Sequence, residues 1–254
     1  MNTTFAEWTQ HVSITNQSPN WLYAALCSAL VGLSGLVPIL FINQNTVPSL
    51  RWMLSFAVGG LLGDVFLHLL PEALASVQTH EDYNKVGLCV LLGLLTFTVL
   101  EKTLEAKISS KSLGYLNLIA NAIDNFNHGL AVGAAFMVSN KVGFVTTGCI
   151  LVHEIPHEVG DFAILIKSGF NRCEAAKAQF STALIGILGA VFALVMDWNT
   201  MSSFIVPFTC GGFLHIALIS VLPDLLESED LVDCVKIVTS IVAGIATMAL
   251  ASCL

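Results

Sequence analysis

The chain has 254 residues, of which 55% are hydrophobic and only 11% are charged, and its mean hydropathy is +0.79. Soluble domains carry roughly 25% charged residues, so this composition excludes an ordinary soluble protein and predicts a polytopic, all-α membrane protein. The net charge of −8, from 18 acidic and 10 basic residues, leaves no basic patch that could bind nucleic acid.

Residues 1–20 are polar and contain neither lysine nor arginine. They include two N-x-Ser/Thr sequons, at Asn2 and Asn16, which fit a tail on the extracytoplasmic side. No basic region followed by a short apolar core precedes the first long hydrophobic stretch, so we expect that stretch to act as an uncleaved signal.

Eight hydrophobic stretches follow, each near the roughly 20 residues that a membrane span requires. They lie at about 21–43, 51–75, 86–101, 114–138, 142–167, 174–196, 203–226 and 231–253. The connections are short, so residues 21–254 are predicted to form one transmembrane domain. An even number of spans places both termini on the same side of the membrane.

The distribution of lysine and arginine predicts the orientation, because these residues concentrate in cytoplasmic loops. With the N-terminus outside, the outer loops contain only Lys85 and Lys141. The inner loops then contain Arg51, Lys102, Lys107, Lys111, Lys167, Arg172, Lys177 and Lys236. We therefore expect both termini to be extracytoplasmic.

The second stretch carries Asp64, His68 and Glu72 at a spacing of four residues, which puts them on one helical stripe. An ionisable group inside a membrane helix is costly and commonly marks a pathway or an ion site. For Asp64 and His68 a metal or pathway role and a purely interior role both stay open, and Glu72 is expected at the mouth of the helix.

The fourth stretch places Asp124, Asn125 and His128 within one arc of the helix, followed by Gly129 and Gly133. The two glycines predict a close helix contact, expected to press the polar arc against the fifth stretch. A structural hydrogen-bond network is the alternative role for the polar residues.

The fifth stretch contains LVHEIPHEVGD, with His153, Glu154, His157, Glu158 and Asp161 in an otherwise apolar segment. At about 100° per residue, positions 153, 157 and 161 share one stripe and positions 154 and 158 lie beside it. Imidazole and carboxylate ligands suit divalent zinc, iron, manganese or cobalt. The fourth and fifth helices could therefore enclose one or two such ions.

Two further polar residues lie in the later stretches. Gln179, in the sixth, is interpreted as an interhelical hydrogen-bond partner or a residue near the pathway, and His215, in the seventh, as a structural histidine. Neither residue type alone predicts an ion ligand.

The sequences DNFNHGLAVGAAF and HEIPHEVGDFAIL resemble the ZIP (Zrt-/Irt-like) metal transporters, in particular the LIV-1 branch with its HE-x-PHE-x-GD signature. The resemblance implies a ZIP-like bundle of eight helices and a mid-membrane metal site. It also implies transport of zinc or iron(II) toward the cytosol by alternating access, and a homodimer in the lipid bilayer. The implied ligands are Asp124, Asn125, His128, His153, Glu154 and His157. Possible pathway or supporting residues are Asp64, His68, Glu158, Asp161 and Gln179.

Three departures from that branch bear on cargo and location. Asp124 and His128 are exchanged relative to the usual H-N-F-x-D-G order, as in the animal subgroup numbered thirteen, which implies a Golgi, endoplasmic reticulum or vesicle membrane, with the plasma membrane still open. The exchange also leaves undecided whether the cargo is zinc or iron(II), and in which direction it is transported. Gly186 replaces a carboxylate found in some bacterial relatives, and no long histidine-rich loop is present.

Two other functions compete with transport. His153-Glu154-Ile155-Pro156-His157 fits the H-E-x-x-H pattern of zinc proteases, in which the glutamate is the general base. Pro156 between the histidines and the unexplained polar residues of the fourth stretch count against an intramembrane protease. A metal-binding scaffold without transport would need more loop surface than this chain offers. We therefore expect a transporter and not an enzyme, with no prosthetic group besides the transported ion.

Overall fold

The computed structural model describes residues 21–41, 47–75, 77, 79–108, 111–193, 198–227 and 230–252, and within these ranges all regular elements are helical. The predicted tail, residues 1–20, lies outside them. The first two rods are interrupted: α2 (Trp21–Leu33), η1 (Ser34–Leu36) and α3 (Val37–Phe41), then α4 (Val47–Asp64), η2 (Val65–Leu69) and α5 (Leu70–Ala75). The remaining elements are α6 (His80–Ile108), α7 (Ser112–Val138), α8 (Asn140–Lys167), α9 (Arg172–Ala193), α10 (Trp198–His215), η3 (Ile216–Val221), α11 (Leu222–Leu226) and α12 (Leu231–Ser252).

Six of these segments are long and apolar enough to cross a membrane. They are Trp21–Ile39, Leu50–Ala75, His80–Ile108, Arg172–Ala193, Ser203–Leu226 and Leu231–Ala251. The all-helical membrane fold is thereby confirmed. The other two expected spans coincide with α7 and α8, which have 27 and 28 residues but contain most of the buried polar side chains. The count of eight spans and the orientation of the termini stay predictions.

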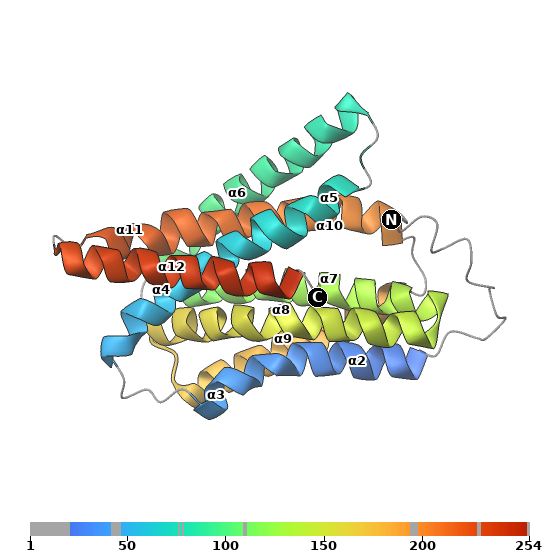
Figure 1. Cartoon of the computed structure of the whole chain (residues 1–254), viewed down its shortest axis with the longest axis horizontal. Coiled ribbons are helices and arrows are strands. Elements are labelled where there is room, and N and C mark those ends of the chain that lie inside the picture. The colour runs from blue at the N-terminus through green and yellow to red at the C-terminus, as the bar shows by residue number, and fades with distance from the viewer. Residues whose placement is uncertain are drawn as a thin grey trace.

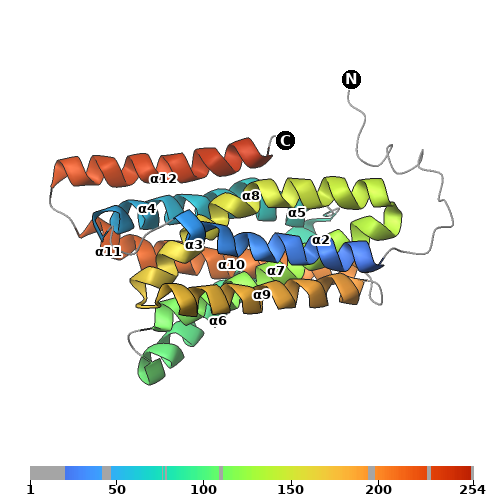
Figure 2. The same ribbon diagram turned by 90° about the horizontal axis from the view of Figure 1, so that it is seen from below.

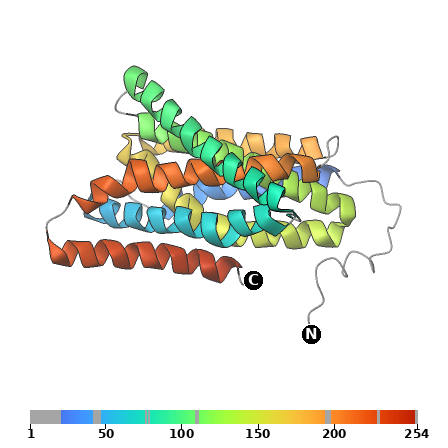
Figure 3. The same cartoon turned by 90° about the horizontal axis from the view of Figure 1, so that it is seen from above.

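The helices pack as two groups (Figures 1, 2 and 3). In one group α2, α7, α8 and α9 contact one another; in the other α12 lies along α4, and α10 along α6. The two groups meet chiefly where α4 contacts α8 and where α10 contacts α7. The polar faces of α7 and α8 are therefore placed near the boundary between the groups.

The outermost helices show what surrounds the bundle. Leucine and valine side chains project outward along α6 and α12, among them Leu88, Leu95, Val99, Val235 and Val242, each more than half exposed. Such surfaces are stable against lipid but not against water. The bundle is thus apolar outside and polar at its centre.

The glycines of α7 make the close helix contact that their spacing predicts, but the partner is α9 and not α8. A Cβ atom at Gly129 would lie 2.0 Å from the carbonyl oxygen of Gly186, and one at Gly189 would lie 2.2 Å from that of Phe126. Only glycine permits backbones this close. With its small-residue face on α9, α7 can turn its polar arc toward α8.

Two helices contain a π-helical segment immediately before a proline. At η2 the amide of Leu70 donates a hydrogen bond to the carbonyl of Val65, and at η3 the amide of Leu222 donates one to the carbonyl of Ala217. In both cases the acceptor lies five residues before the donor. Pro71 and Pro223 follow. A proline ring crowds the carbonyl four residues earlier, and the wider π turn relieves that clash.

Candidate metal centre

The predicted ligands all lie in the middle parts of α7 and α8 and are all buried. None has more than 6% of its surface exposed. Both helices continue through the positions concerned, and α8 is helical across Pro156. The spacing of three or four residues therefore brings each polar stripe to the α7–α8 interface.

One group of three side chains joins the two helices. His128, His153 and Glu154 each offer a ligand atom, and these atoms lie within 4.8 Å of one another. The Nε2 atom of His128 lies 3.1 Å from Glu154 Oε1 and 3.1 Å from Asp124 Oδ2. The two imidazole rings stand 5.1 Å apart between centroids. Two imidazoles and a carboxylate match the ligands that zinc and iron(II) take.

A second group adds a residue from α4. Asp64, Asp124 and His157 also place one ligand atom each within a 4.8 Å span. Asp64 reaches the site because α4 packs against α8, and it is 2% exposed. We name the six residues of these two groups the central cluster: Asp64, Asp124, His128, His153, Glu154 and His157.

Asn125 lies apart from this cluster although the sequence grouped it with Asp124 and His128. Its Nδ2 atom is 2.6 Å from Asn121 Oδ1, and its own Oδ1 lies 3.0 Å from where a Cβ of Gly32 would be. The side chain therefore lies toward α2 and α9. Neighbouring positions on a helix differ by about 100°, so Asp124 and Asn125 present different faces.

Several buried polar atoms of the central cluster have no hydrogen-bond partner within the described part of the protein. In the part of the chain that the structure describes, no hydrogen-bond partner is found for these buried atoms: Asp64 Oδ1, Asp124 Oδ1, His153 Nε2, Glu154 Oε2, and Nδ1 and Nε2 of His157. A buried polar atom without a partner destabilises a protein by roughly 1–3 kcal/mol. These unpartnered atoms belong to residues of the two ligand groups, so the cluster offers buried donor atoms that a cation would satisfy.

A hydrogen-bonded network continues from the cluster along α8. Asn121 donates to the carboxylates of both Glu158 and Asp161, and Gln179 of α9 donates to Glu158. Glu158 is 0% exposed. Glu158, Asp161 and Gln179 are thus joined with one another, one turn away from the ligand groups.

The sequence analysis did not single out Asn121, which connects this network. Its signal was the repeat of polar residues at 117, 121, 124 and 128 of α7, whose steps of three and four residues define one helical face. Asn117 and Asn121 are each 1% exposed, which places them with the cluster in the interior.

A pocket of about 430 Å³ reaches the cluster from one end of the bundle. Its lining residues come from η2, α5, α7, α8 and α12, and they include His68, Glu72, Asn127, His128 and His153. Cys149 and Val145 line it nearer the start of α8. The pocket therefore lies toward the end of the bundle where α7 ends and α8 begins, which we name the α7–α8 end.

His215 lies in a different environment, between α10 and α6. Its Nε2 atom is 2.9 Å from Glu101 Oε2 and its Nδ1 atom is 3.2 Å from Thr98 Oγ1. His215 is 0% exposed. Both ring nitrogens have partners, so this histidine joins two helices, in line with the structural role expected for it.

Comparison with known proteins finds a matching family and several similar proteins. The family model described as ZIP Zinc transporter matches residues 18–112 and 102–252. Zinc transporter ZIP13 of Pongo abelii is 50% identical to the chain, and the match spans 91% of this chain and 78% of the relative. The human protein of the same name is 43% identical, and the match spans 91% of this chain and 81% of the relative. The Drosophila melanogaster protein named Zinc transporter ZIP13 homolog is 39% identical, and the match spans 90% of this chain and 88% of the relative. The likeness thus extends over nearly the whole chain.

Proposed function

This chain belongs to the ZIP zinc transporter family, and we propose that it carries zinc or iron(II) toward the cytosol by way of the central cluster. Family membership makes it a multi-pass membrane protein that transports metal, and not an enzyme. The intramembrane protease is therefore not favoured, although His153, Glu154 and His157 fit its pattern.

The observation that carries the proposed site is the convergence of unpartnered, buried ligand atoms where α4, α7 and α8 meet. A cation bound there offsets the burial of the carboxylates and imidazoles that face it. Because the groups are held by three helices, a shift of one helix against another would change the ligand geometry and release the ion. This is the behaviour that a transport site requires, whereas a structural site would be fully closed.

The pocket and the predicted orientation support the proposed direction of transport. With both termini extracytoplasmic, the α7–α8 end faces the lumen or the outside, so the ion would enter through the pocket beside His68 and Glu72. The start of α2 and the end of α12 point to the same end of the bundle, in keeping with an even number of spans (Figures 1 and 2). Release would occur past Glu158 and Asp161 toward the cytosol.

The cargo is proposed as zinc, with iron(II) as the second candidate. The group of His128, His153 and Glu154 has the two imidazoles and one carboxylate that both metals accept. Asp64 and Asp124 give the other group two carboxylates and one imidazole, a harder set that favours iron(II) relative to zinc. Both metals therefore belong in the test.

Three finer statements also belong to the proposal. The chain has eight spans, because α7 and α8 have membrane length and their polar residues face inward. It resides in the Golgi, the endoplasmic reticulum or a vesicle, and it acts as a homodimer, as the resemblance to the thirteenth animal subgroup implies.

The test is metal flux into proteoliposomes, with zinc and with iron(II) under anaerobic conditions. Wild type, His157→Ala and the exposed-histidine control His80→Ala are compared at equal amounts of folded protein. We expect flux in wild type and control and its loss in His157→Ala, because neither buried ring nitrogen of His157 has a hydrogen-bond partner among the described residues. Flux at the wild-type rate in folded His157→Ala would exclude the site, and no flux of either metal in wild type would exclude transport.

A further inference from the structure

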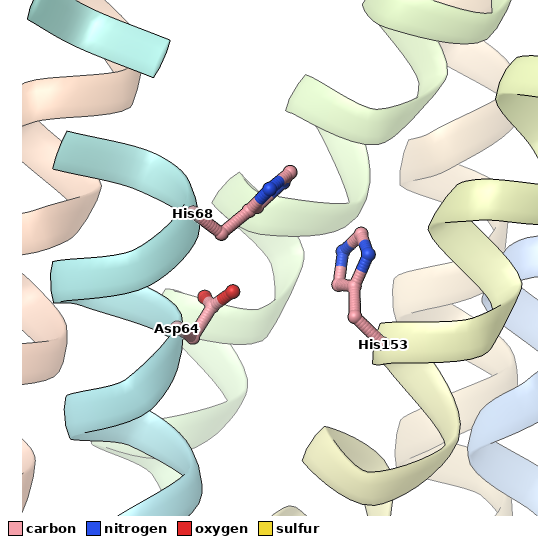
Figure 4. A group of neighbouring side chains, drawn as sticks. All are labelled: Asp64, His68 and His153. Carbon is pink, nitrogen blue, oxygen red and sulfur yellow. The ribbon is translucent and has the colours of Figure 1, made fainter. Parts of the chain in front are cut away.

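A third set of ligand atoms combines two residues of the central cluster with His68, which lines the pocket. Asp64 at the end of α4, His68 in η2 and His153 in α8 each offer one atom, and these atoms lie within 4.8 Å of one another. The rings of His68 and His153 are 4.4 Å apart between centroids, tilted by 41°. Figure 4 shows Asp64 and His68 projecting from one helix toward His153 on the facing helix. We name these three residues the outer triad.

Within the described part of the chain, two atoms of the outer triad have no hydrogen-bond partner. Asp64 Oδ1 and His153 Nε2 are buried and have no hydrogen-bond partner among the described residues, and their side chains belong to residues only 2% and 6% exposed. The Nε2 atom of His68 lies 3.9 Å from Glu72 Oε2, beyond hydrogen-bond length. His68 lines the pocket and is partly exposed, so an ion can reach it from outside.

His153 belongs both to the outer triad and to the group with His128 and Glu154. Its Nδ1 atom lies 3.3 Å from the carbonyl oxygen of Cys149, which leaves Nε2 as the nitrogen available for metal. One nitrogen lone pair binds one ion, so the two groups cannot both use His153 at the same time.

We infer that the outer triad is a separate, first-occupied metal site, and that His153 passes the ion from it to His128 and Glu154. The inference rests on the proposed function and adds a step to it. Two imidazoles and one carboxylate, with the remaining positions open to water from the pocket, give zinc or iron(II) an incomplete shell. An ion held in this way is bound firmly enough to lose part of its hydration and loosely enough to move on.

The site also joins the two helix groups, since Asp64 and His68 lie on the α4 rod and His153 lies on α8. Movement of the ion to His128 and Glu154 replaces Asp64 and His68, the two ligands on the α4 rod, with ligands of α7 and α8. The ion is then held mainly by the helix group that contains α7 and α8. Transfer through His153 would therefore free this group to move relative to α4.

The first test is flux as a function of zinc concentration, with His68→Gln and the control Thr146→Ala. Thr146 lines the same pocket from α8 but belongs to none of the ligand groups. We expect His68→Gln to raise the zinc concentration for half-maximal flux at least about tenfold, and the control to leave it unchanged. Wild-type zinc dependence in His68→Gln would overturn the inference, whereas absence of flux in wild type itself would instead contradict the proposed function.

The second test detects ligation directly, by the absorption band of a cobalt(II)–thiolate bond. Cobalt(II) is added to purified wild type, His68→Cys and Thr146→Cys, so that the native cysteines and a new pocket cysteine serve as controls. A thiolate band in His68→Cys alone supports the triad, and its absence there overturns it. A thiolate band in His68→Cys together with wild-type flux in His68→Gln would also overturn the inferred transfer through His153. The outer triad would then bind metal without lying on the transport path.

Discussion

Two arrangements of buried histidine and carboxylate lie in this bundle, and they differ in how fully their polar atoms are paired. Between α6 and α10, His215 contacts Glu101 with one ring nitrogen and Thr98 with the other. In the central cluster, both nitrogens of His157 lack a partner among the described residues. Both histidines are buried, but their ring nitrogens differ in pairing, and unpartnered buried atoms of this kind support the proposed ion site.

The difference also predicts how each arrangement responds to mutation. A paired buried group stabilises the fold, and removing one partner leaves the other uncompensated. In the central cluster Glu154 and Asp124 contact His128, but each also has an oxygen without a partner among the described residues, and the carboxylates repel one another until a cation binds, so neutralising one of them removes repulsion. The two regions should respond to loss of a negative charge with opposite signs.

The largest expected effect is that of Glu154→Gln on transport. The substitution keeps the size of the side chain and removes the charge that faces His128, so we expect zinc flux to fall by at least about tenfold. Without metal, the melting temperature should stay equal to that of wild type or rise, and the increase that zinc gives wild type should disappear. A lower melting temperature of the metal-free variant would show that Glu154 is a structural partner, like Glu101.

The next effect in size is that of Glu101→Ala on stability. This change leaves the 0% exposed His215 without its partner and should lower the free energy of unfolding by about 3–5 kcal/mol. Thermal denaturation in detergent measures the loss, and flux per folded molecule should stay at the wild-type level. Glu105→Ala on the same helix is the control, because Glu105 pairs with Lys102 at an exposed position. If Glu101→Ala and Glu105→Ala lowered the free energy of unfolding equally, the structural role of the Glu101–His215 pair would be contradicted.

The smallest effect is expected from Lys167→Met. Lys167 Nζ lies 2.6 Å from Asp224 Oδ2 and so ties α8 to α11, but the Asp224 side chain is 60% exposed. Exposed ion pairs contribute up to about 1 kcal/mol, which limits the change in flux to about fivefold. A loss of flux comparable to that of Glu154→Gln would mean that this pair takes part in transport itself.

Helical periodicity predicted which side chains of α7 and α8 would lie together, whereas the packing of α4 against them could not be predicted from the sequence. The stripe of His153 and His157 follows from helical periodicity, and α8 presents both to the cluster. The packing of Asp64 against Asp124 and His157 depends on how α4 lies on α8, which no local pattern contains. For the same reason the spacing of Gly129 and Gly133 predicted a close contact but assigned it to the wrong helix.

Asn125 illustrates a second limit of sequence reasoning. The motif that resembles the family places Asn125 beside Asp124, yet adjacent residues of a helix face directions about 100° apart. The direction of each side chain is decided by the neighbours available, here Asn121 and the backbone at Gly32. A resemblance can therefore locate a site along the chain without deciding which member of the motif faces the ion.

The π-helical segments η2 and η3 have a consequence for how this protein can change in evolution. Each π turn holds one residue more than an α turn, so deleting a single residue from it would restore an α-helix while the residues beyond the turn keep their direction. Glu72 would then stay at the pocket and Asp224 beside Lys167, but each proline would again crowd the carbonyl four residues before it. The extra residue of each turn is therefore tied to its proline, and the same deletion in an α-helical stretch would instead rotate the acid by about 100°.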